Sequence, residues 1–85
     1  MAYVSEYSEE AVIQLEKLDK PAAKRILKKI DSALNNPSHF FEQLTGHPEY
    51  KLRVGNYRII ANIDDKACKI FIRTVGHGKN IYDER

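Results

Sequence analysis

Basic side chains recur at alternate positions along three short segments in the C-terminal half of the chain. They are Lys51, Arg53, Arg58, Lys69 and Arg73. Because successive side chains of a strand point to opposite faces, this spacing predicts that all five lie on one face of a sheet, with no carboxylate among them. Such a face suits contact with a polyanion and stabilisation of phosphate charge. A solvated sheet face usually carries both signs of charge, so the imbalance favours binding.

Two large apolar side chains, Ile60 and Phe71, fall among these cations together with Asn62. Apolar residues exposed on a sheet surface often mark a contact site, so we expect Ile60 and Phe71 to bind a partner. The alternate positions are predicted to face the helices and form the core. They are Leu52, Val54, Ile59, Ala61, Ile63, Ile70 and Ile72.

Other chemistry finds little support in the residue pattern. His39, His47 and His77 lack the neighbouring cysteines or carboxylates of a zinc site. Cys68 is expected to pack at the start of a strand, and Ser8 is better explained as a helix cap than as a nucleophile. No glycine-rich phosphate loop is present. Catalysis would therefore depend on Lys, Arg, Tyr and His side chains, without metal or cofactor.

The length and composition indicate one small domain spanning residues 1–85. The chain has 85 residues, of which 42% are hydrophobic, and a net charge of +2. Residues 51–85 are the basic part, with eight Lys/Arg against four acids, whereas residues 1–50 have six against eight. A single cysteine excludes an internal disulfide, and no apolar run approaches the ~20 residues that span a bilayer. We therefore expect a cytoplasmic protein without a membrane segment.

Helical periodicity dominates the first part of the chain. Residues 3–7 read as a strand, and Ser8 is expected to cap a helix of about ten residues with Val12, Leu15 and Leu18 on its apolar side. Asp19 should cap a second helix that ends at residues 35–37. Its apolar stripe is Ala23, Ile26, Leu27, Ile30, Ala33 and Leu34, and its solvated side carries Lys24, Arg25, Lys28, Lys29 and Asp31.

The period changes to two after an irregular stretch at residues 37–49, in which Phe40, Phe41 and Leu44 are expected to contact the core. Strands are predicted at residues 50–54, 57–63 and 68–75, with a tight hairpin turn at Gly55-Asn56. Gly76 and Gly78 should interrupt the pattern before a short segment at residues 80–82. The order of an N-terminal strand, a two-helix hairpin and an antiparallel meander predicts an α+β fold.

Residues 50–60 (YKLRVGNYRII) resemble the central motif of the RelE/ParE toxin superfamily, and residues 44–46 (LTG) and 75–82 (VGHGKNIY) resemble its flanking motifs. Within the superfamily the motif is more similar to RelE than to ParE. The resemblance implies a RelE-like toxin of a type II toxin–antitoxin pair that enters the ribosomal A site and cleaves mRNA without a metal. It also implies a hetero-oligomer with a RelB-like antitoxin, which we expect to bind Ile60 and Phe71.

The resemblance also assigns roles to residues. Lys51 matches a catalytic lysine, Arg58 the arginine that stabilises the phosphate, and Tyr82 the C-terminal tyrosine. Lys79 is the candidate for a further catalytic cation, because Gly78 stands where the family usually has arginine. The remaining candidates, expected to bind RNA, are Arg53, Arg73, Lys69 and His77.

Two other functions stay open on the sequence. One is a ParE-like inhibitor of DNA gyrase that cleaves no RNA. The other is a catalytically weakened member that mainly binds its antitoxin, an alternative that Gly78 and the absence of a second lysine at Glu49-Tyr50 favour.

Overall fold

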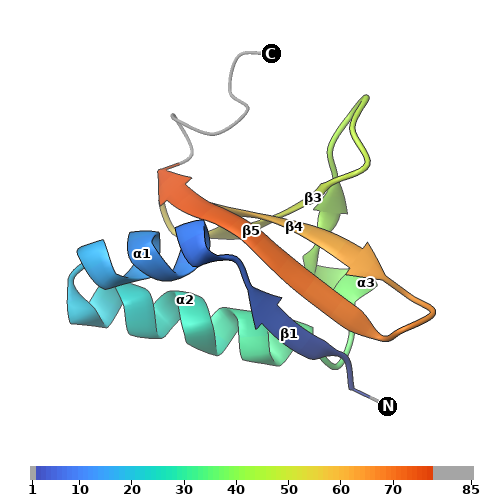
Figure 1. Ribbon diagram of the computed structural model, residues 1–85, viewed down its shortest axis with the longest axis horizontal. Coiled ribbons are helices and arrows are strands. Elements are labelled where there is room, and N and C mark those ends of the chain that lie inside the picture. The colour runs from blue at the N-terminus through green and yellow to red at the C-terminus, as the bar shows by residue number, and fades with distance from the viewer. Residues whose placement is uncertain (1, 78–85) are drawn as a thin grey trace.

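The computed structural model describes residues 2–77 and confirms the α+β class (Figure 1). Five strands form one sheet in the order β1-β5-β4-β3-β2. The elements along the chain are β1 (Val4–Tyr7), α1 (Glu9–Lys17), α2 (Lys20–Ala33), α3 (Pro37–Phe40), β2 (Glu42–Gln43), β3 (Tyr50–Val54), β4 (Tyr57–Asp64) and β5 (Lys69–His77). Among the described residues, no helix has the length and apolar content needed to cross a bilayer.

Both predicted helix caps are confirmed. The Ser8 hydroxyl oxygen accepts a 3.0 Å hydrogen bond from the Ala11 amide at the start of α1, and an Asp19 carboxylate oxygen accepts a 3.4 Å bond from the Ala22 amide at the start of α2. These bonds satisfy amides that have no partner within the first helical turn. Pro21 lies in that opening turn of α2, where a missing amide costs nothing.

Strands β3, β4 and β5 form the predicted antiparallel meander. Gly55 adopts a φ of +59° in the turn between β3 and β4, a conformation that glycine accepts without strain. The turn between β4 and β5 is stabilised by Asp64, whose carboxylate accepts hydrogen bonds of 3.1 Å from the amides of Lys66 and Ala67. Cys68 belongs to this turn, with a φ of +53°, so the expectation that it opens the strand is wrong.

The first strand completes the sheet by pairing with β5 in parallel, from Val4 opposite Lys69 to Tyr7 opposite Ile72. Beside this pairing, β5 contains a bulge relative to β4, because Ile60 pairs with Thr74 whereas Ala61 pairs with Ile72. One residue of β5, Arg73, is therefore inserted without an opposite partner. Strand β5 continues through Gly76 to His77, beyond the predicted end at residue 75.

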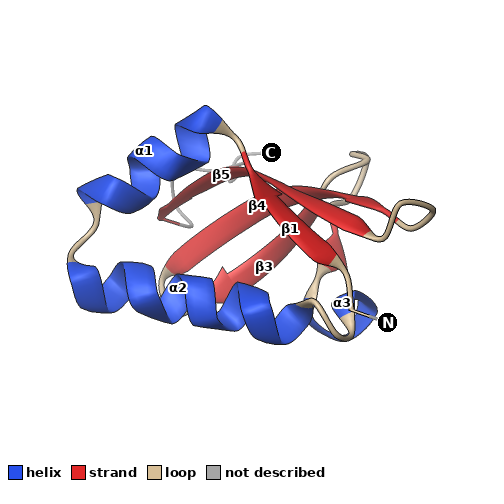
Figure 2. Ribbon diagram, turned by 60° about the horizontal axis from the view of Figure 1, so that its bottom comes forward, coloured by secondary structure: helices blue, strands red, loops and turns tan. Residues whose placement is uncertain are grey.

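The core lies between the sheet and the helices. Figure 2 shows α1 and α2 joined as a hairpin beside the strands. The strand residues predicted to face the helices are buried or partly buried against this core, as expected. Val75 joins them at 3% exposure because the bulge reverses the alternation after Ile72. The apolar stripes of the helices are wider than the sheet can cover, since Val12 is 42% and Leu27 is 39% exposed.

The irregular stretch contains two short elements that its sequence did not predict. The single-turn helix α3 ends next to Phe41, which is 5% exposed and contacts the core as expected. Phe40 is also packed against the core, and Leu44 is half-buried. Strand β2 then pairs with Tyr50 and Lys51 of β3 and forms one edge of the sheet.

Candidate functional site

The face of the sheet turned away from the helices, called the open face below, carries the predicted basic residues. On β3 and β4, Arg53 lies opposite Arg58, and Lys51 lies opposite Ile60. Directly opposed residues of an antiparallel pair project from the same face, with Cβ atoms about 5 Å apart. Lys51, Arg53 and Arg58 therefore share the open face, as the sequence predicted, and they gather at one end of it, called the basic end.

Gly76 occupies the next position in the same row, opposite Arg58 on β5. A glycine there places no side chain on the open face beside the Arg58 guanidinium group. The row from Arg53 through Arg58 to Gly76 thus combines two cations with a position on the third strand that carries no side chain. This geometry fits a phosphate group held against the sheet by two guanidinium groups.

Ile60 departs from expectation. Its position on the open face is as predicted, but its side chain is 0% exposed. It lies between Lys51 on one neighbouring strand and Thr74 on the other. The expectation that Ile60 is exposed for a partner is therefore wrong, because the sequence pattern gives the face of a residue and says nothing of how completely its neighbours cover it.

The charge balance of the open face also differs from the prediction. Glu42 on β2 lies opposite Lys51, with 3.8 Å between a carboxylate oxygen and Lys51 Nζ. Glu6 on β1 lies 3.2 Å from Lys69 Nζ. Asp64 also shares this face, opposite Lys69. The prediction that this face carries five cations and no carboxylate is therefore wrong for the face as a whole. No carboxylate lies opposite Arg53 or Arg58, however.

Lys69 belongs to a different region of the open face. It is seven residues before Gly76 on β5, a separation of about 23 Å at the usual rise of a strand. The half-buried Phe71 lies near Lys69, opposite Asn62 and beside Glu6. The structure thus separates Lys69 and Phe71 from the basic end, where the sequence had grouped them with it.

Arg73 and His77 have their own neighbours on β5. Arg73 is exposed, and its Nη1 donates a 3.2 Å hydrogen bond to Asn62 Oδ1 on β4. His77 lies opposite Tyr57, with ring centroids 4.8 Å apart. Since Tyr57 precedes Arg58 in the strand, this ring pair lies on the face opposite to the Arg58 side chain. His77 therefore flanks the end of the sheet and does not join the basic end.

Ser8 and Gln14, which the sequence did not identify as positioning residues, hold β5 where β1 stops pairing with it. The Ser8 amide donates to the Ile72 carbonyl at 2.9 Å, and the Ser8 hydroxyl donates to the Arg73 carbonyl at 2.6 Å. Gln14 Oε1 accepts bonds from the Val75 amide at 2.6 Å and the Thr74 hydroxyl at 3.1 Å. Helix α1 and its N-cap residue thus provide hydrogen-bond partners for the edge of β5 just before Gly76.

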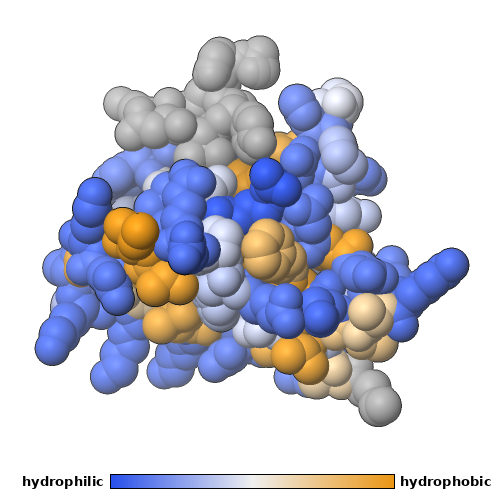
Figure 3. All heavy atoms as spheres, in the orientation of Figure 1, coloured by the Kyte–Doolittle hydropathy of each residue, from blue (hydrophilic) through white to orange (hydrophobic). Residues whose placement is uncertain are grey.

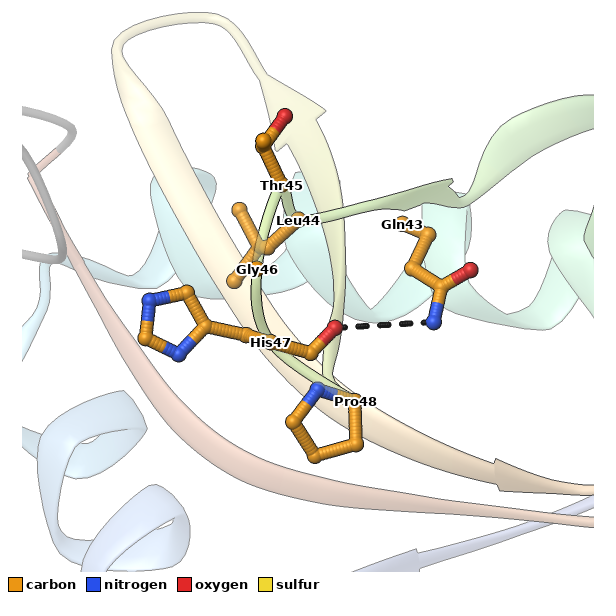
Figure 4. A pocket seen from close by; sticks show the side chains of 6 residues that line it. All are labelled: Gln43, Leu44, Thr45, Gly46, His47 and Pro48. Carbon is orange, nitrogen blue, oxygen red and sulfur yellow. Dashed lines mark hydrogen bonds between the residues drawn. The ribbon is translucent and has the colours of Figure 1, made fainter.

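A hollow of about 510 Å³ lies in the loop between β2 and β3 (Figure 4). Residues 43–48 line it, and Gln43 Nε2 donates a 3.5 Å hydrogen bond to the His47 carbonyl across the loop. The His47 ring points away from the Gln43 side chain. The hollow is lined by no lysine, arginine or carboxylate side chain and is separate from the basic end.

Two of the predicted catalytic residues, Lys79 and Tyr82, lie outside residues 2–77, as does the departure at Gly78. Within residues 2–77, no group of three His, Cys, Asp or Glu side chains is arranged to hold a metal ion.

Comparisons with known proteins agree with this fold. A family model described as the ParE toxin of the type II toxin–antitoxin system parDE matches residues 6–82. The Escherichia coli protein named mRNA interferase toxin RelE is 29% identical over 79 residues, covering 89% of this chain and 83% of that protein.

Solved structures of toxin–antitoxin complexes contain chains with the same fold. The RelBE2 complex from Mycobacterium tuberculosis contains a chain with a TM-score of 0.84 at 21% identity, covering 91% of this chain and 92% of that chain. The intact Escherichia coli RelBE complex contains one with a TM-score of 0.76 at 28% identity, covering 89% and 96%.

Proposed function

The chain belongs to the ParE toxin family of type II toxin–antitoxin systems, within the RelE/ParE superfamily, and from this premise we propose that it is a ribosome-dependent mRNA endonuclease. The observation that carries the proposal is the pairing of Arg53 with Arg58 on the open face, next to Lys51 and Gly76. The similarity to a protein named mRNA interferase toxin RelE supports RNA as the substrate.

The proposed reaction is attack by the 2′-hydroxyl of the RNA on the adjacent phosphorus. The new O–P bond closes a 2′,3′-cyclic phosphate, and the bond from phosphorus to the 5′-oxygen breaks. The phosphorane formed on the way carries more negative charge than the substrate, so preorganised cations lower its free energy more than that of the ground state. Arg58, with Arg53 beside it, is positioned for this role.

Proton transfer completes the reaction. The 2′-hydroxyl proton must leave as the oxygen attacks, and we assign Lys51 Nζ as its acceptor in the neutral amine form, because an ammonium group has no lone pair that could take the proton. The 5′-oxygen must gain a proton as it departs, a role proposed for Tyr82 or the cation of Lys79. None of these steps needs a metal, because the arginines supply the positive charge that a metal ion would otherwise provide.

The partners follow from the same proposal. The protein would act in the cytoplasm on ribosome-bound mRNA and be held inactive in a hetero-oligomer with a RelB-like antitoxin. The fold is shared with chains from toxin–antitoxin complexes, which supports this partner. Phe71, half-buried on the open face, is the apolar contact proposed for the antitoxin.

Toeprinting of a translated message with purified ribosomes and the full chain tests the proposal. In-frame cuts in the A site that depend on the ribosome are the expected result. Intact mRNA under conditions in which the protein arrests growth would contradict it.

The description of the matching family model favours a second candidate, a ParE-like inhibitor of DNA gyrase. Gyrase-linked breaks in supercoiled DNA, with mRNA left intact, would support this alternative. If neither mRNA nor DNA is cut while the antitoxin binds tightly, the protein is a weakened member of the family.

A further inference from the structure

A hollow of about 410 Å³ lies between α2 and the β3–β4 turn, and Arg53 is the only one of its lining residues that the proposed reaction uses. This hollow is called the α2 groove below, and basic side chains dominate its lining. The lining residues are Arg25, Lys28, Lys29, Ser32, Arg53, Val54 and Gly55. The groove therefore has four cations and no carboxylate. Figure 3 shows both hydrophilic and hydrophobic side chains on the part of the surface over α1 and α2.

The helical part of this lining is a continuous stripe. Arg25, Lys28, Lys29 and Ser32 follow one another at the spacings i, i+3, i+4 and i+7, which place them on one side of α2. Like charges at such spacings repel each other and destabilise a helix. Helix α2 has five Lys/Arg and only one carboxylate, Asp31, so its positive charges outnumber the acids that could relieve this repulsion.

The β3–β4 turn closes the groove from the other side. The Arg25 Nη1 atom lies 3.4 Å from the position that a Cβ would occupy on Gly55, so the guanidinium group rests against the turn. Neither Arg25 nor Lys28 forms an ion pair with any residue in the described range 2–77. Their charges are thus held at the groove and left for an external anion.

We propose that the α2 groove binds the phosphate backbone of an RNA segment other than the one that is cleaved. The choice of RNA over another polyanion rests on the proposed function. An acidic peptide is the competing ligand, but peptides that fold on binding also need apolar contacts. The only apolar side chain in the lining, Val54, is 6% exposed. Binding of a phosphate backbone depends mainly on cations, and the groove supplies these.

Arg53 connects this groove with the basic end. It lines the groove and also lies opposite Arg58 on the open face. A folded RNA, such as the ribosome presents around its message, could therefore contact both surfaces at once. The groove would hold the protein on structured RNA while the basic end receives the scissile strand, so its loss should weaken association and leave the chemical step intact.

Matched charge-neutralising variants of the full chain test this inference. The groove variant carries Arg25→Gln, Lys28→Gln and Lys29→Gln. The control carries Lys17→Gln, Lys20→Gln and Lys24→Gln, three exposed cations outside the lining. Both variants have three fewer positive charges than wild type. The probe is a labelled RNA hairpin with 2′-O-methyl groups, which cannot undergo 2′-hydroxyl attack, and its affinity is measured as a function of salt concentration.

The expected result is a salt dependence whose log–log slope falls by about 3 in the groove variant, one unit for each phosphate that the variant no longer neutralises. Its affinity at 0.15 M salt should fall about tenfold or more, and the control should stay within about threefold of wild type. Circular dichroism establishes that both variants are folded. Equal decreases in the two variants would overturn the inference, because net charge alone would then explain them.

Two further outcomes separate the α2 groove from the proposed function. If the groove variant binds the hairpin normally but has a lower affinity for an acidic peptide, the groove is a peptide site and the inference fails. If wild-type protein binds the hairpin through the groove but leaves ribosome-bound mRNA intact, the proposed function fails and the groove assignment stands. Single-turnover cleavage at saturating protein should be unchanged in the groove variant.

Discussion

Arg53 on β3 and Arg58 on β4 lie directly opposite each other, so both basic side chains project from the same face of the sheet. Like charges in this arrangement destabilise a pair of strands, by an amount on the order of 0.2–1 kcal/mol. A bound phosphate relieves the repulsion because it attracts both groups. The proposed function gives this pair an anion-binding role.

Replacing Arg58 with alanine is expected to reduce cleavage of ribosome-bound mRNA more than any other single change. Removing one preorganised charge stabiliser typically lowers the rate ~10²–10³-fold. Lys51→Ala should follow, within the ~10²–10⁴-fold range of general acid–base groups. Lys66→Ala, which removes an exposed cation from the β4–β5 turn, is the matched control and should cleave normally. Wild-type rates for folded Arg58→Ala and Lys51→Ala proteins would show that the site is elsewhere.

Antitoxin binding provides a second prediction, at Phe71. Replacing this half-buried side chain with serine should weaken the complex, because burying a phenylalanine stabilises an interface by about 1.5–3 kcal/mol. Ile13→Ser on α1 is the control, since Ile13 is 51% exposed and α1 lies on the side of the sheet opposite to the open face that carries Phe71. Calorimetric titration measures both affinities.

A decrease below about 0.5 kcal/mol for Phe71→Ser, the size of an ordinary surface effect, would contradict this assignment. A larger decrease in affinity for Ile13→Ser would instead indicate that the antitoxin binds the helices. There, a hollow of about 350 Å³ is lined by Tyr7, Val12, Leu15, Glu16, Ala23 and Leu27.

The link between α1 and β5 predicts a large stability effect at Gln14. Its Oε1 accepts from the Val75 amide and the Thr74 hydroxyl, so Gln14→Ala leaves a half-buried pair of donors without this partner. The free energy of unfolding should fall by about 1–3 kcal/mol. Gln14→Glu keeps an acceptor oxygen but places a second carboxylate beside Glu10, to which Gln14 Nε2 donates a 3.2 Å bond, so it should recover only part of the stability. Denaturant titration of the three proteins measures the effect, and equal stabilities for Gln14→Ala and wild type would show that the bonds contribute nothing.

The raised pKa of Tyr3 predicts a loss of stability at high pH. Its hydroxyl donates a 2.6 Å hydrogen bond to Asp65, and this bond, with desolvation and the Asp65 charge, raises the pKa of Tyr3 from 10.0 to about 12. The unfolded chain ionises first, so the contribution to stability is complete below pH 10 and disappears as the pH rises to about 12. Unfolding measured as a function of pH should show this decline in wild type.

The matched variant for that measurement is Tyr3→Phe, which keeps the ring and removes the ionisable group. Its stability should decline less steeply than that of wild type between pH 10 and 12. Superimposable curves for the two proteins would mean that the hydrogen bond to Asp65 does not form in solution.

Local patterns in the sequence were sufficient for much of the fold. The caps at Ser8 and Asp19 and the turn at Gly55-Asn56 depend on neighbours a few residues away, and all three are confirmed. The alternation that places Lys51, Arg53 and Arg58 on one face is equally local, because the pleat of a strand has a fixed period of two. The register of Arg53 opposite Arg58 follows from the two-residue turn between their strands.

Tertiary structure alone decided which distant segments flank these residues. Glu6 reaches the open face because β1 pairs with β5, and Glu42 because β2 pairs with β3. The bulge at Arg73 reverses the alternation of β5, and its backbone is held by Ser8, 65 residues away in the sequence. Such pairings depend on how the whole core packs, and a period read along one strand carries no information about them. For the same reason Ile60 has the face that its position predicts and a burial that its position could not predict.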